Sequence, residues 1–484
     1  MFRKTVSLAV TIAVFLSAGL AQAGDIEDAI ITKVVKAYGG DALVTAKSIK
    51  IIDYSKSLWP GQSEVPSQPD FFRDNAELTV DFLGKRKSML SWRVSRTAKD
   101  LDRFVFDGQK GRIYDVLNHK YSDEPWLTYS TLGARVIRAS DTMIARNLQS
   151  GTDTVVYGGE VAYRGEIHQK LHVATSSGRE HTLFIDKASG LISKKERYRP
   201  NSSDLTYVFS NHRQADGVTY AQDMNFFVGD APRQVSVDRR IELNPEMEQL
   251  FTEPKGYSGW GEIADTTEMR VQKLASNVYH AGKGRSFSVF IDTGDYFVAA
   301  GGEAGLKDKL QAVSRVVGKE KPLKYMVLTH HHNEHLRALN EAVELGANIV
   351  TVEDHLSTVH KNTAADLPSD RLSMVNGKLS VGNGAVEIYD ITTAHSKHYL
   401  LVYVPEAKIV FAEDHYGTEL VSAVPRVHKD MVRFREKIES LGFGVEMFVD
   451  GHGPRILTNA EFKDATDAYG DIVCPEGYMI CAKG

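Results

Sequence analysis

The pattern of apolar residues changes once along this chain, near a segment rich in glycine and proline at Thr252–Glu262. Before that segment, apolar and polar residues alternate, as in Ala76–Phe82, where every second side chain is apolar. Such alternation is typical of half-buried strands joined by hairpin turns. After it, short apolar runs alternate with helix-length amphipathic segments. The sequence therefore predicts a mostly antiparallel β domain followed by an α/β domain.

We place the antiparallel β domain at residues 24–255, with one helix expected at Ile26–Ala37 before two glycines end it. The α/β domain is expected at residues 262–470. In that part, strands are predicted at residues 325–329 and 347–352, and helices at 334–346 and 430–442, each ended by a glycine.

The two ends of the chain carry separate signals. Arg3 and Lys4 precede an apolar run that ends in Ala-Gln-Ala, which predicts a signal peptide at residues 1–23. The run is too short for a membrane span, so we expect a periplasmic or secreted protein without a transmembrane segment in the mature chain. Residues 471–484 form a tail with the only two cysteines, Cys474 and Cys481. An oxidising compartment would let them pair, and two free thiols are the alternative.

Four histidines and one carboxylate lie within "THHHNEHL", residues 329–336. With 17 histidines in 484 residues, a His-x-His-x-x-His pattern is expected by chance only about 0.02 times. Residues two apart in an extended loop face the same way, so His330 and His332 can share one metal ion. Glu334 and His335 then turn toward a second position. The net charge of −5 gives no reason to expect a nucleic-acid partner.

Further donors follow strand-like segments later in the chain, at His395, Asp414 and His452. Layered α/β proteins usually build sites at strand ends on one edge of the fold. In this order the residues resemble the metallo-β-lactamase-fold hydrolase superfamily, and an exported subgroup of it, over about Thr267–Asn459. The resemblance implies an αββα sandwich.

The same resemblance implies a ligand set. His330, His332 and His395 would hold a first metal, Glu334, His335 and His452 a second, and Asp414 would bridge them. One or two zinc ions suit these ligands, with manganese or iron as alternatives. Such ions lower the pKa of a water molecule and polarise the bond under attack.

Glu334 departs from the family, which has aspartate there. The extra methylene adds roughly 1.5 Å, against a tolerance of about 0.2 Å in ligand distances. Either the side chain folds back to reach the metal, or the second site is weakened and Glu334 acts as a general base. The catalytic candidates are therefore Glu334 and Asp414.

The N-terminal part loosely resembles periplasmic domains of the LolA and LppX type, curved antiparallel sheets that cradle an apolar ligand. Together these features predict an exported hydrolase acting on an ester, lactone, thioester or lactam, with a small substrate of apolar or acylated character. The competing hypothesis is a non-catalytic periplasmic ligand-binding protein with a degenerate metal site.

Other polar residues near the motifs could contact a substrate oxyanion, with an ordinary structural role as the alternative: Lys397, His398, Tyr399, His415 and Tyr416. His331 is expected to point away from the metal. His355 and His360 are expected to be solvated helix residues.

Overall fold

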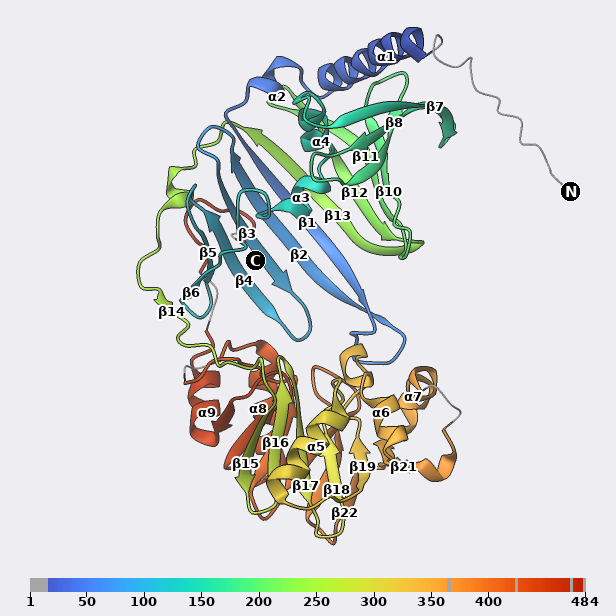
Figure 1. The fold of residues 1–484 in the computed structure, drawn as a ribbon. Coiled ribbons are helices and arrows are strands. Elements are labelled where there is room, and N and C mark those ends of the chain that lie inside the picture. Colours follow the sequence, from blue (N-terminus) through green and yellow to red (C-terminus); the bar gives the residue numbers. More distant parts are fainter. Residues whose placement is uncertain (1–15, 364–366, 423–424, 471–472, 482–484) are drawn as a thin grey trace, which may run out of the picture.

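The computed structural model describes residues 16–363, 367–422, 425–470 and 473–481, with side chains from Gly24 onward. The protein is mixed α/β and mostly sheet, built as two parts that lie one above the other (Figure 1). Most of the predicted signal peptide lies outside the described residues. Helix α1 (Leu16–Ala37) continues through the predicted cleavage position before Gly24. Among the described helices, none combines the length and apolar character needed to cross a bilayer.

The N-terminal part is one 14-stranded sheet in the order β14-β6-β5-β4-β3-β2-β1-β13-β12-β11-β10-β9-β8-β7. Its neighbours are antiparallel apart from the short β14–β6 pair, as the alternating sequence predicted. The strands are β1 (Ser48–Pro60), β2 (Pro69–Asp81), β3 (Arg86–Val94), β4 (Lys99–Phe106), β5 (Gly111–Asp115), β6 (Lys120–Asp123), β7 (Thr154–Tyr163), β8 (Glu166–Ala174), β9 (Glu180–Asp186), β10 (Ile192–Arg197), β11 (Leu205–Ala215), β12 (Val218–Val228), β13 (Ala231–Leu243) and β14 (Ser258–Gly259).

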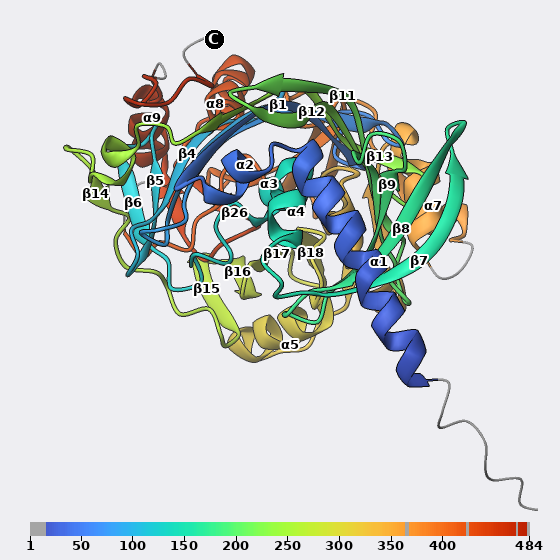
Figure 2. The ribbon, with the colours of Figure 1, turned by 90° about the horizontal axis from the view of Figure 1, so that it is seen from above.

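Helices cover one face of this sheet, and Figure 2 shows α1 and α4 lying across its inner side. They are α1, α2 (Asp41–Thr45), α3 (Ala134–Arg138) and α4 (Asp141–Leu148). Their apolar side chains form one core with the strands. Helix α1 ends where Gly39 takes a φ of +126°, and a Cβ there would lie 2.6 Å from the Gly217 oxygen. Only glycine fits this turn.

The covered face divides along the strands into an apolar and a polar zone. Cross-strand partners share a face, so one row of the register contains Ile51, Leu78, Met89, Phe104 and Ile113. All five belong to the core under the helices or pack against it. Two residues further along the strands, the matching row contains Asp53, Ala76, Ser91, Asp102 and Asp115. The same strands thus present carboxylates beyond the helices.

The C-terminal part contains two mixed sheets. The first, in sequence order, contains β15 (Arg270–Ala275), β16 (Val278–Lys283), β17 (Ser286–Asp292), β18 (Phe297–Ala300), β19 (Leu323–Val327), β20 (Asn348–Thr351) and β21 (Leu372–Met374). The second contains β22 (Lys378–Val381), β23 (Val386–Ile391), β24 (Tyr399–Val404), β25 (Ile409–Glu413), β26 (Met447–Asp450) and β27 (Ile456–Thr458). The change of sheet, from β14 to β15, falls at the glycine- and proline-rich segment.

Three apolar clusters organise this part. One lies between the two sheets and includes Val298 and Val402. A second packs α5, α6 and α7 on the outer face of the first sheet, and a third packs α8 and α9 on the outer face of the second. Adjacent residues such as Val298 and Ala299 enter different clusters, as the pleat of a strand requires. The helices are α5 (Leu306–Val317), α6 (Leu339–Glu344), α7 (Leu356–Asn362), α8 (Lys429–Leu441) and α9 (Asn459–Asp467).

The predicted helix at 430–442 is confirmed as α8, and Gly442 ends it with a φ of +70°. The predicted helix at 334–346 is interrupted. A short 3₁₀ turn at Asn333–Leu336 precedes α6, because the Ala338 N–H donates to Gly302 O at 2.9 Å instead of continuing the helix. Three other 3₁₀ turns lie at Glu248–Phe251, Glu353–His355 and Ser369–Arg371.

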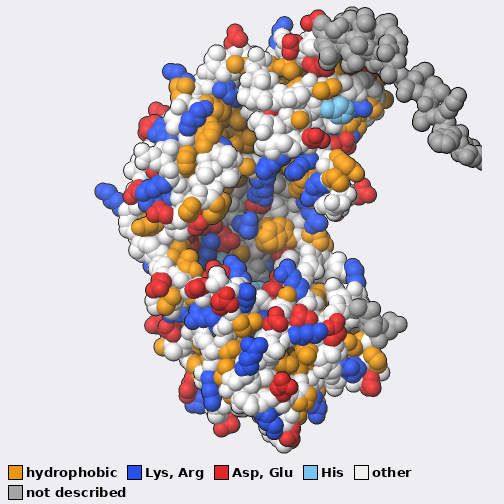
Figure 3. Space-filling model, viewed as in Figure 1, with side chains coloured by type: hydrophobic (Ala, Val, Ile, Leu, Met, Phe, Trp, Pro, Cys, Tyr) orange, Lys and Arg blue, Asp and Glu red, His pale blue; other side chains and the backbone are white. Residues whose placement is uncertain are grey.

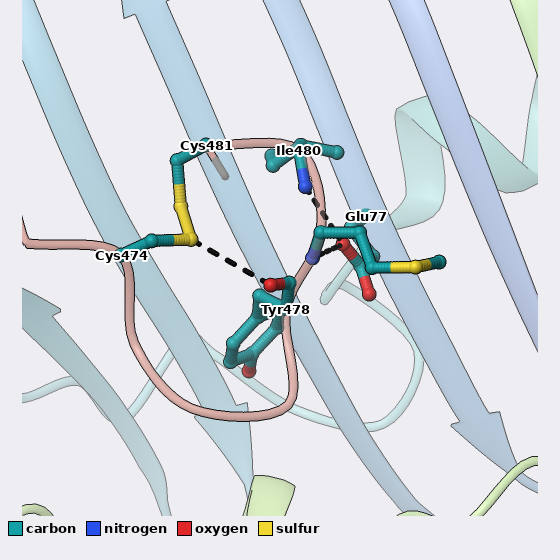
Figure 4. The surroundings of a disulfide bond; sticks show 6 residues. Glu77, Cys474, Tyr478, Ile480 and Cys481 are labelled. Atoms are coloured by element: carbon teal, nitrogen blue, oxygen red, sulfur yellow. Dashed lines mark hydrogen bonds between the residues drawn. A yellow bond between two sulfur atoms is a disulfide. The ribbon is translucent and has the colours of Figure 1, made fainter. Parts of the chain in front are cut away.

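The C-terminal tail returns to the N-terminal sheet. Its cysteines pair as the disulfide Cys474–Cys481, which confirms the predicted pairing. Beside the disulfide, the N–H groups of Met479 and Ile480 donate to the buried Glu77 carboxylate at 2.7 and 3.2 Å (Figure 4). Tail residues also join an apolar cluster with Leu90 and other strand residues on the sheet face opposite the helices. The chain therefore crosses between the two parts twice.

Candidate metal centre

The predicted histidine and aspartate donors lie on loops at one edge of the two-sheet part, the edge that faces the N-terminal sheet. The Leu400 N–H donates to Thr329 O at 2.7 Å and joins the two sheets at this edge. The donors follow different strands: His330 and His332 follow β19, His335 lies in the next 3₁₀ turn, His395 lies between β23 and β24, Asp414 follows β25 and His452 follows β26.

A first group brings together His330, His332, His395 and Asp414, with one ligand atom from each within 4.8 Å of the others. The three rings are arranged compactly, with centroids 4.5 Å apart for His330 and His332 and 4.7 Å apart for His330 and His395. His330 and His332 are buried almost completely. This is the first ligand set that the sequence predicted.

Three ring nitrogens of this group are buried and make no well-aligned hydrogen bond within the described residues, although two of them lie 3.3 Å (His330) and 2.9 Å (His395) from Asp414 Oδ2. They are His330 Nε2, His332 Nδ1 and His395 Nε2. Buried polar atoms are normally hydrogen-bonded, so three unpaired nitrogens facing one carboxylate need an explanation. Imidazole nitrogens with a carboxylate oxygen are the donor set that zinc and related ions take. The residues present therefore fit a metal ion.

A second group contains His335, His452 and again Asp414. His335 Nε2 lies 2.9 Å from Asp414 Oδ2, and His452 Nε2 contacts the other oxygen, Oδ1. Because Asp414 belongs to both groups, its carboxylate stands where a bridging ligand would.

The protonation of these residues follows their surroundings. Burial lowers the pKa of His330 and of His332 well below the ordinary value, which leaves both rings neutral. Burial also opposes charge on His395 and His452, but contact with the Asp414 carboxylate outweighs it and raises each pKa to about 9. The Asp414 carboxyl has its pKa held well below its usual range, since the charges of His335 and His452 outweigh burial. Cations that bound here would displace protons.

Each of four rings directs its other nitrogen toward an oxygen, at hydrogen-bond distance for all but His452. His335 Nδ1 lies 2.9 Å from Glu413, His395 Nδ1 3.2 Å from Asp430, His332 Nε2 3.0 Å from Ser63 O and His452 Nδ1 3.6 Å from Glu303. Such contacts set the tautomer and hold a ligand in place. Sequence reasoning missed all four. Only Glu413 could have been found from the sequence, because it adjoins the predicted donor Asp414. The other three oxygens, of Asp430, Ser63 and Glu303, lie far in the sequence from the histidines that they face.

Glu334 is not brought into either group. Its Oε2 accepts a hydrogen bond of 2.7 Å from Gln62 Nε2, a residue of the loop between β1 and β2. Neighbouring residues of that loop also reach the site, since Ser63 O contacts His332 and Glu64 O accepts the Lys397 N–H at 2.8 Å. The N-terminal sheet thus extends a loop onto the metal centre (Figure 1).

A second connection joins the polar row of the N-terminal sheet to the segment before α8. Arg426 donates to Asp102 at 2.8 Å and lies 3.1 Å from Asp115. Asp430, in the first turn of α8, contacts His395. Carboxylates of the N-terminal sheet therefore hold the segment that leads to a residue beside the first donor group.

The remaining sequence predictions divide. His360 is exposed as expected, but the prediction for His355 is wrong. His355 is 1% exposed and packs on His331, with ring centroids 5.0 Å apart. Of the proposed oxyanion contacts, Tyr399, His415 and Tyr416 are buried and bond backbone oxygens. His398 and Lys397 instead face Asp354.

A cavity of about 570 Å³ opens beside the second group. His452 lines it, with Tyr121 of β6 and Trp260 of the segment between the two parts. Arg285 and Ile263 also line this cavity. Both parts of the chain thus form its walls. Figure 3 shows that the molecule is hollowed between the two parts and that Lys and Arg side chains gather around the hollow.

Comparison with known proteins gave matches only among solved structures. No family model and no curated protein sequence matches this chain. A metallo-β-lactamase from Hirschia baltica is 14% identical, with 42% of this chain and 97% of that chain covered and a TM-score of 0.32. The metallo-β-lactamase FIM-1 from Pseudomonas aeruginosa, in its mono-zinc form, is 15% identical over 42% and 96%, with a TM-score of 0.33. A putative outer membrane lipoprotein-sorting protein domain from Vibrio parahaemolyticus is 13% identical over 46% and 97%, with a TM-score of 0.31.

Proposed function

We propose that this protein is an exported metal-dependent hydrolase that cleaves an ester, lactone, thioester or lactam, and that its C-terminal part is an αββα sandwich. One observation carries the proposal. Three buried histidine nitrogens without hydrogen-bond partners converge on a carboxylate that a second pair of histidines shares. Buried groups of this kind, unpaired and aimed at one point, are arranged for a ligand.

Two ions fit the donor groups, and zinc suits them best. His330, His332 and His395 would hold the first, His335 and His452 the second, with Asp414 between them. When bound, such ions lower the pKa of a water molecule and polarise the acyl bond. Glu413 and Asp430 keep His335 and His395 in the tautomer that binds.

Asp414 is the catalytic residue of this proposal. Its two oxygens face both groups, so it accepts a hydrogen bond from the attacking water and orients that water toward the acyl carbon. The reaction adds the hydroxyl of water to the acyl carbon. The bond to oxygen, sulfur or nitrogen breaks, and the leaving atom takes the proton.

Glu334 has a different task in this proposal. With Oε2 bound to Gln62, it fastens the β1–β2 loop over the centre. The longer side chain reaches across the seam between the two parts. We therefore assign Glu334 to docking rather than to metal binding or proton transfer.

A non-catalytic ligand-binding protein is the second candidate. The position of Glu334 favours it, because the second group then offers three side chains and not four. That arrangement would hold a second ion less tightly.

The test is metal analysis of protein purified without chelators, joined to activity on lactones, thioesters, esters and β-lactams. We expect one or two zinc ions per chain and hydrolysis that chelation abolishes and zinc restores. His330→Ala should lose metal and activity, whereas His360→Ala, a change of an exposed histidine, should keep both. Protein without metal contradicts the hydrolase and favours the binding protein with a degenerate metal site, and metal without hydrolysis also favours the binding protein.

A further inference from the structure

Arg96 belongs to a turn of the N-terminal sheet that contacts the C-terminal part beside the first donor group. It lies in the turn between β3 and β4, where Ser95 Oγ accepts the N–H groups of Thr97 and Ala98 at 3.1 and 2.9 Å. Thr97 O in turn accepts the Asp430 N–H at 3.1 Å. Asp430 is the carboxylate beside His395. The turn is therefore fixed against the wall of the first donor group.

The guanidinium of Arg96 is poorly satisfied where it lies. Its two terminal nitrogens are buried and donate no hydrogen bond to any residue that the structure describes. The carboxylate it approaches is Asp70, whose Oδ2 is 3.9 Å from Nη2, too far for a hydrogen bond. By contrast, Arg135 of α3 makes two bonds to Asp74, at 2.6 and 3.0 Å. Arg96 thus keeps a fork of donors without an acceptor.

Asp70 is close both to Arg96 and to His395 of the first donor group. Burial raises the pKa of the Asp70 carboxyl, and the charges of Arg96 and of His395 both act against that rise. A cation from the N-terminal sheet and a ligand of the first group therefore lie close to one carboxyl. Asp70 is drawn toward its neutral form by burial, so it is a weak counter-charge for the guanidinium.

The planar fork of an arginine matches the two oxygens of an oxyanion. We propose that Arg96 binds the oxyanion group of an acidic substrate, a carboxylate, sulfate or phosphate, while the acyl bond of that substrate lies at the metal centre. This inference rests on the proposed hydrolase function and narrows it to anionic substrates. The N-terminal sheet would then select the substrate by charge, and Arg96 is a specificity residue.

The first experiment compares matched substrates. Each thioester in a panel is used as an acid and as a neutral isostere, for example the succinyl and 4-methylpentanoyl thioesters of N-acetylcysteamine. In Arg96→Met we expect kcat/KM for the acids to fall about 10- to 100-fold, mostly through KM, as loss of a charged hydrogen bond predicts. Values for the neutral isosteres should stay within about twofold, and Arg96→Lys should restore part of the loss. An equal fall for both members of a pair overturns the inference.

A second experiment needs no turnover. Calorimetry measures binding of succinate and of acetate to the zinc-loaded protein, and Arg96→Met should weaken succinate about 10-fold and leave acetate unchanged. Arg164→Met, a change in the distant β7–β8 turn, is the control and should alter neither. If the wild-type protein binds succinate no more tightly than acetate, the inference fails even where hydrolysis is found. If hydrolysis is absent and succinate is preferred through Arg96, the proposed function fails alone.

Discussion

Buried polar side chains behave differently in the N-terminal sheet and at the metal centre. In the sheet, Arg239 is fully buried yet donates to Ala139 O at 2.8 Å and to Asp53 at 3.1 Å. At the metal centre, His330 and His332 are as deeply buried and leave a nitrogen each without a partner. Charges that pair with one another hold a fold together, whereas donors left unpaired around one point await a ligand. Arg239 Nε and Asp53 Oδ1 also lack a hydrogen-bond partner, so neither burial nor a missing partner by itself separates structure from function. What distinguishes the metal centre is that unpaired nitrogens of three rings lie around one carboxylate.

The largest expected effect comes from removing the shared carboxylate. Asp414→Asn should abolish binding of at least one zinc ion and lower kcat by about 10³-fold. The fold should remain, because in the part of the chain that the structure describes the Asp414 carboxylate contacts only histidines of the centre. Zinc content by mass spectrometry and kcat on the best substrate provide the measurement. A variant that holds zinc as the wild type does would show that Asp414 is not a ligand of either ion.

The opposite result is expected in the sheet. Arg239→Met leaves Asp53 buried without its partner and should lower the free energy of unfolding by about 3–5 kcal/mol, with zinc content of the folded protein unchanged. Arg240→Met is the matched control, since Arg240 is half exposed and pairs with Asp238. Loss of that surface pair should cost less than about 1 kcal/mol. Urea unfolding of both variants makes the comparison, and equal effects would refute the role given to pairing.

Asp430 contacts both regions, through Thr97 of the N-terminal sheet and His395 of the metal centre. Its replacement should have an intermediate effect on zinc binding. Asp430→Asn weakens the contact that orients His395 and should reduce zinc affinity about 10- to 100-fold. Asp464→Asn, on the exposed side of α9, should leave it unchanged. Competition with a zinc-binding dye measures both. Unchanged affinity in Asp430→Asn would mean that the N-terminal sheet docks without positioning the ligand.

The smallest effect concerns Glu334 and distinguishes docking from metal binding. Glu334→Gln keeps an oxygen for Gln62, so stability and zinc content should stay close to wild type. Gln62→Ala removes that bond and should cost about 1 kcal/mol in unfolding. Loss of the second zinc in Glu334→Gln would instead identify Glu334 as a ligand.

Much of the fold was predictable from local patterns. Alternation with period two predicted the antiparallel sheet, and the later change in pattern predicted the mixed part, because each pattern reflects which side of an element is buried. The helix prediction at 334–346 was less successful. A backbone bond from Ala338 to Gly302 interrupts that helix, and no local pattern carries such a contact.

The candidate metal-binding residues could also be predicted from local sequence patterns. His330, His332 and His335 lie in one short motif, and His395, Asp414 and His452 follow strands whose ends meet at one edge. The prediction for His355 failed, because helical spacing does not show that another segment, here His331, packs against the side chain and buries it.

The sequence by itself predicted an antiparallel part followed by an α/β part, a donor set of which the structure brings six of seven members together, and a disulfide in the tail. Only the tertiary structure decided where Glu334 points, what orients His332 and His395, and that the turn containing Arg96 meets Asp430 beside His395. The physical reason is the separation in sequence between the residues that are in contact. Periodicity and motif spacing record contacts between residues near one another in the chain. The contacts decided by the tertiary structure join residues that are 35 positions apart for His395 and Asp430, 272 for Gln62 and Glu334, and 269 for Ser63 and His332. Packing of the strands, helices and the two parts brings them together.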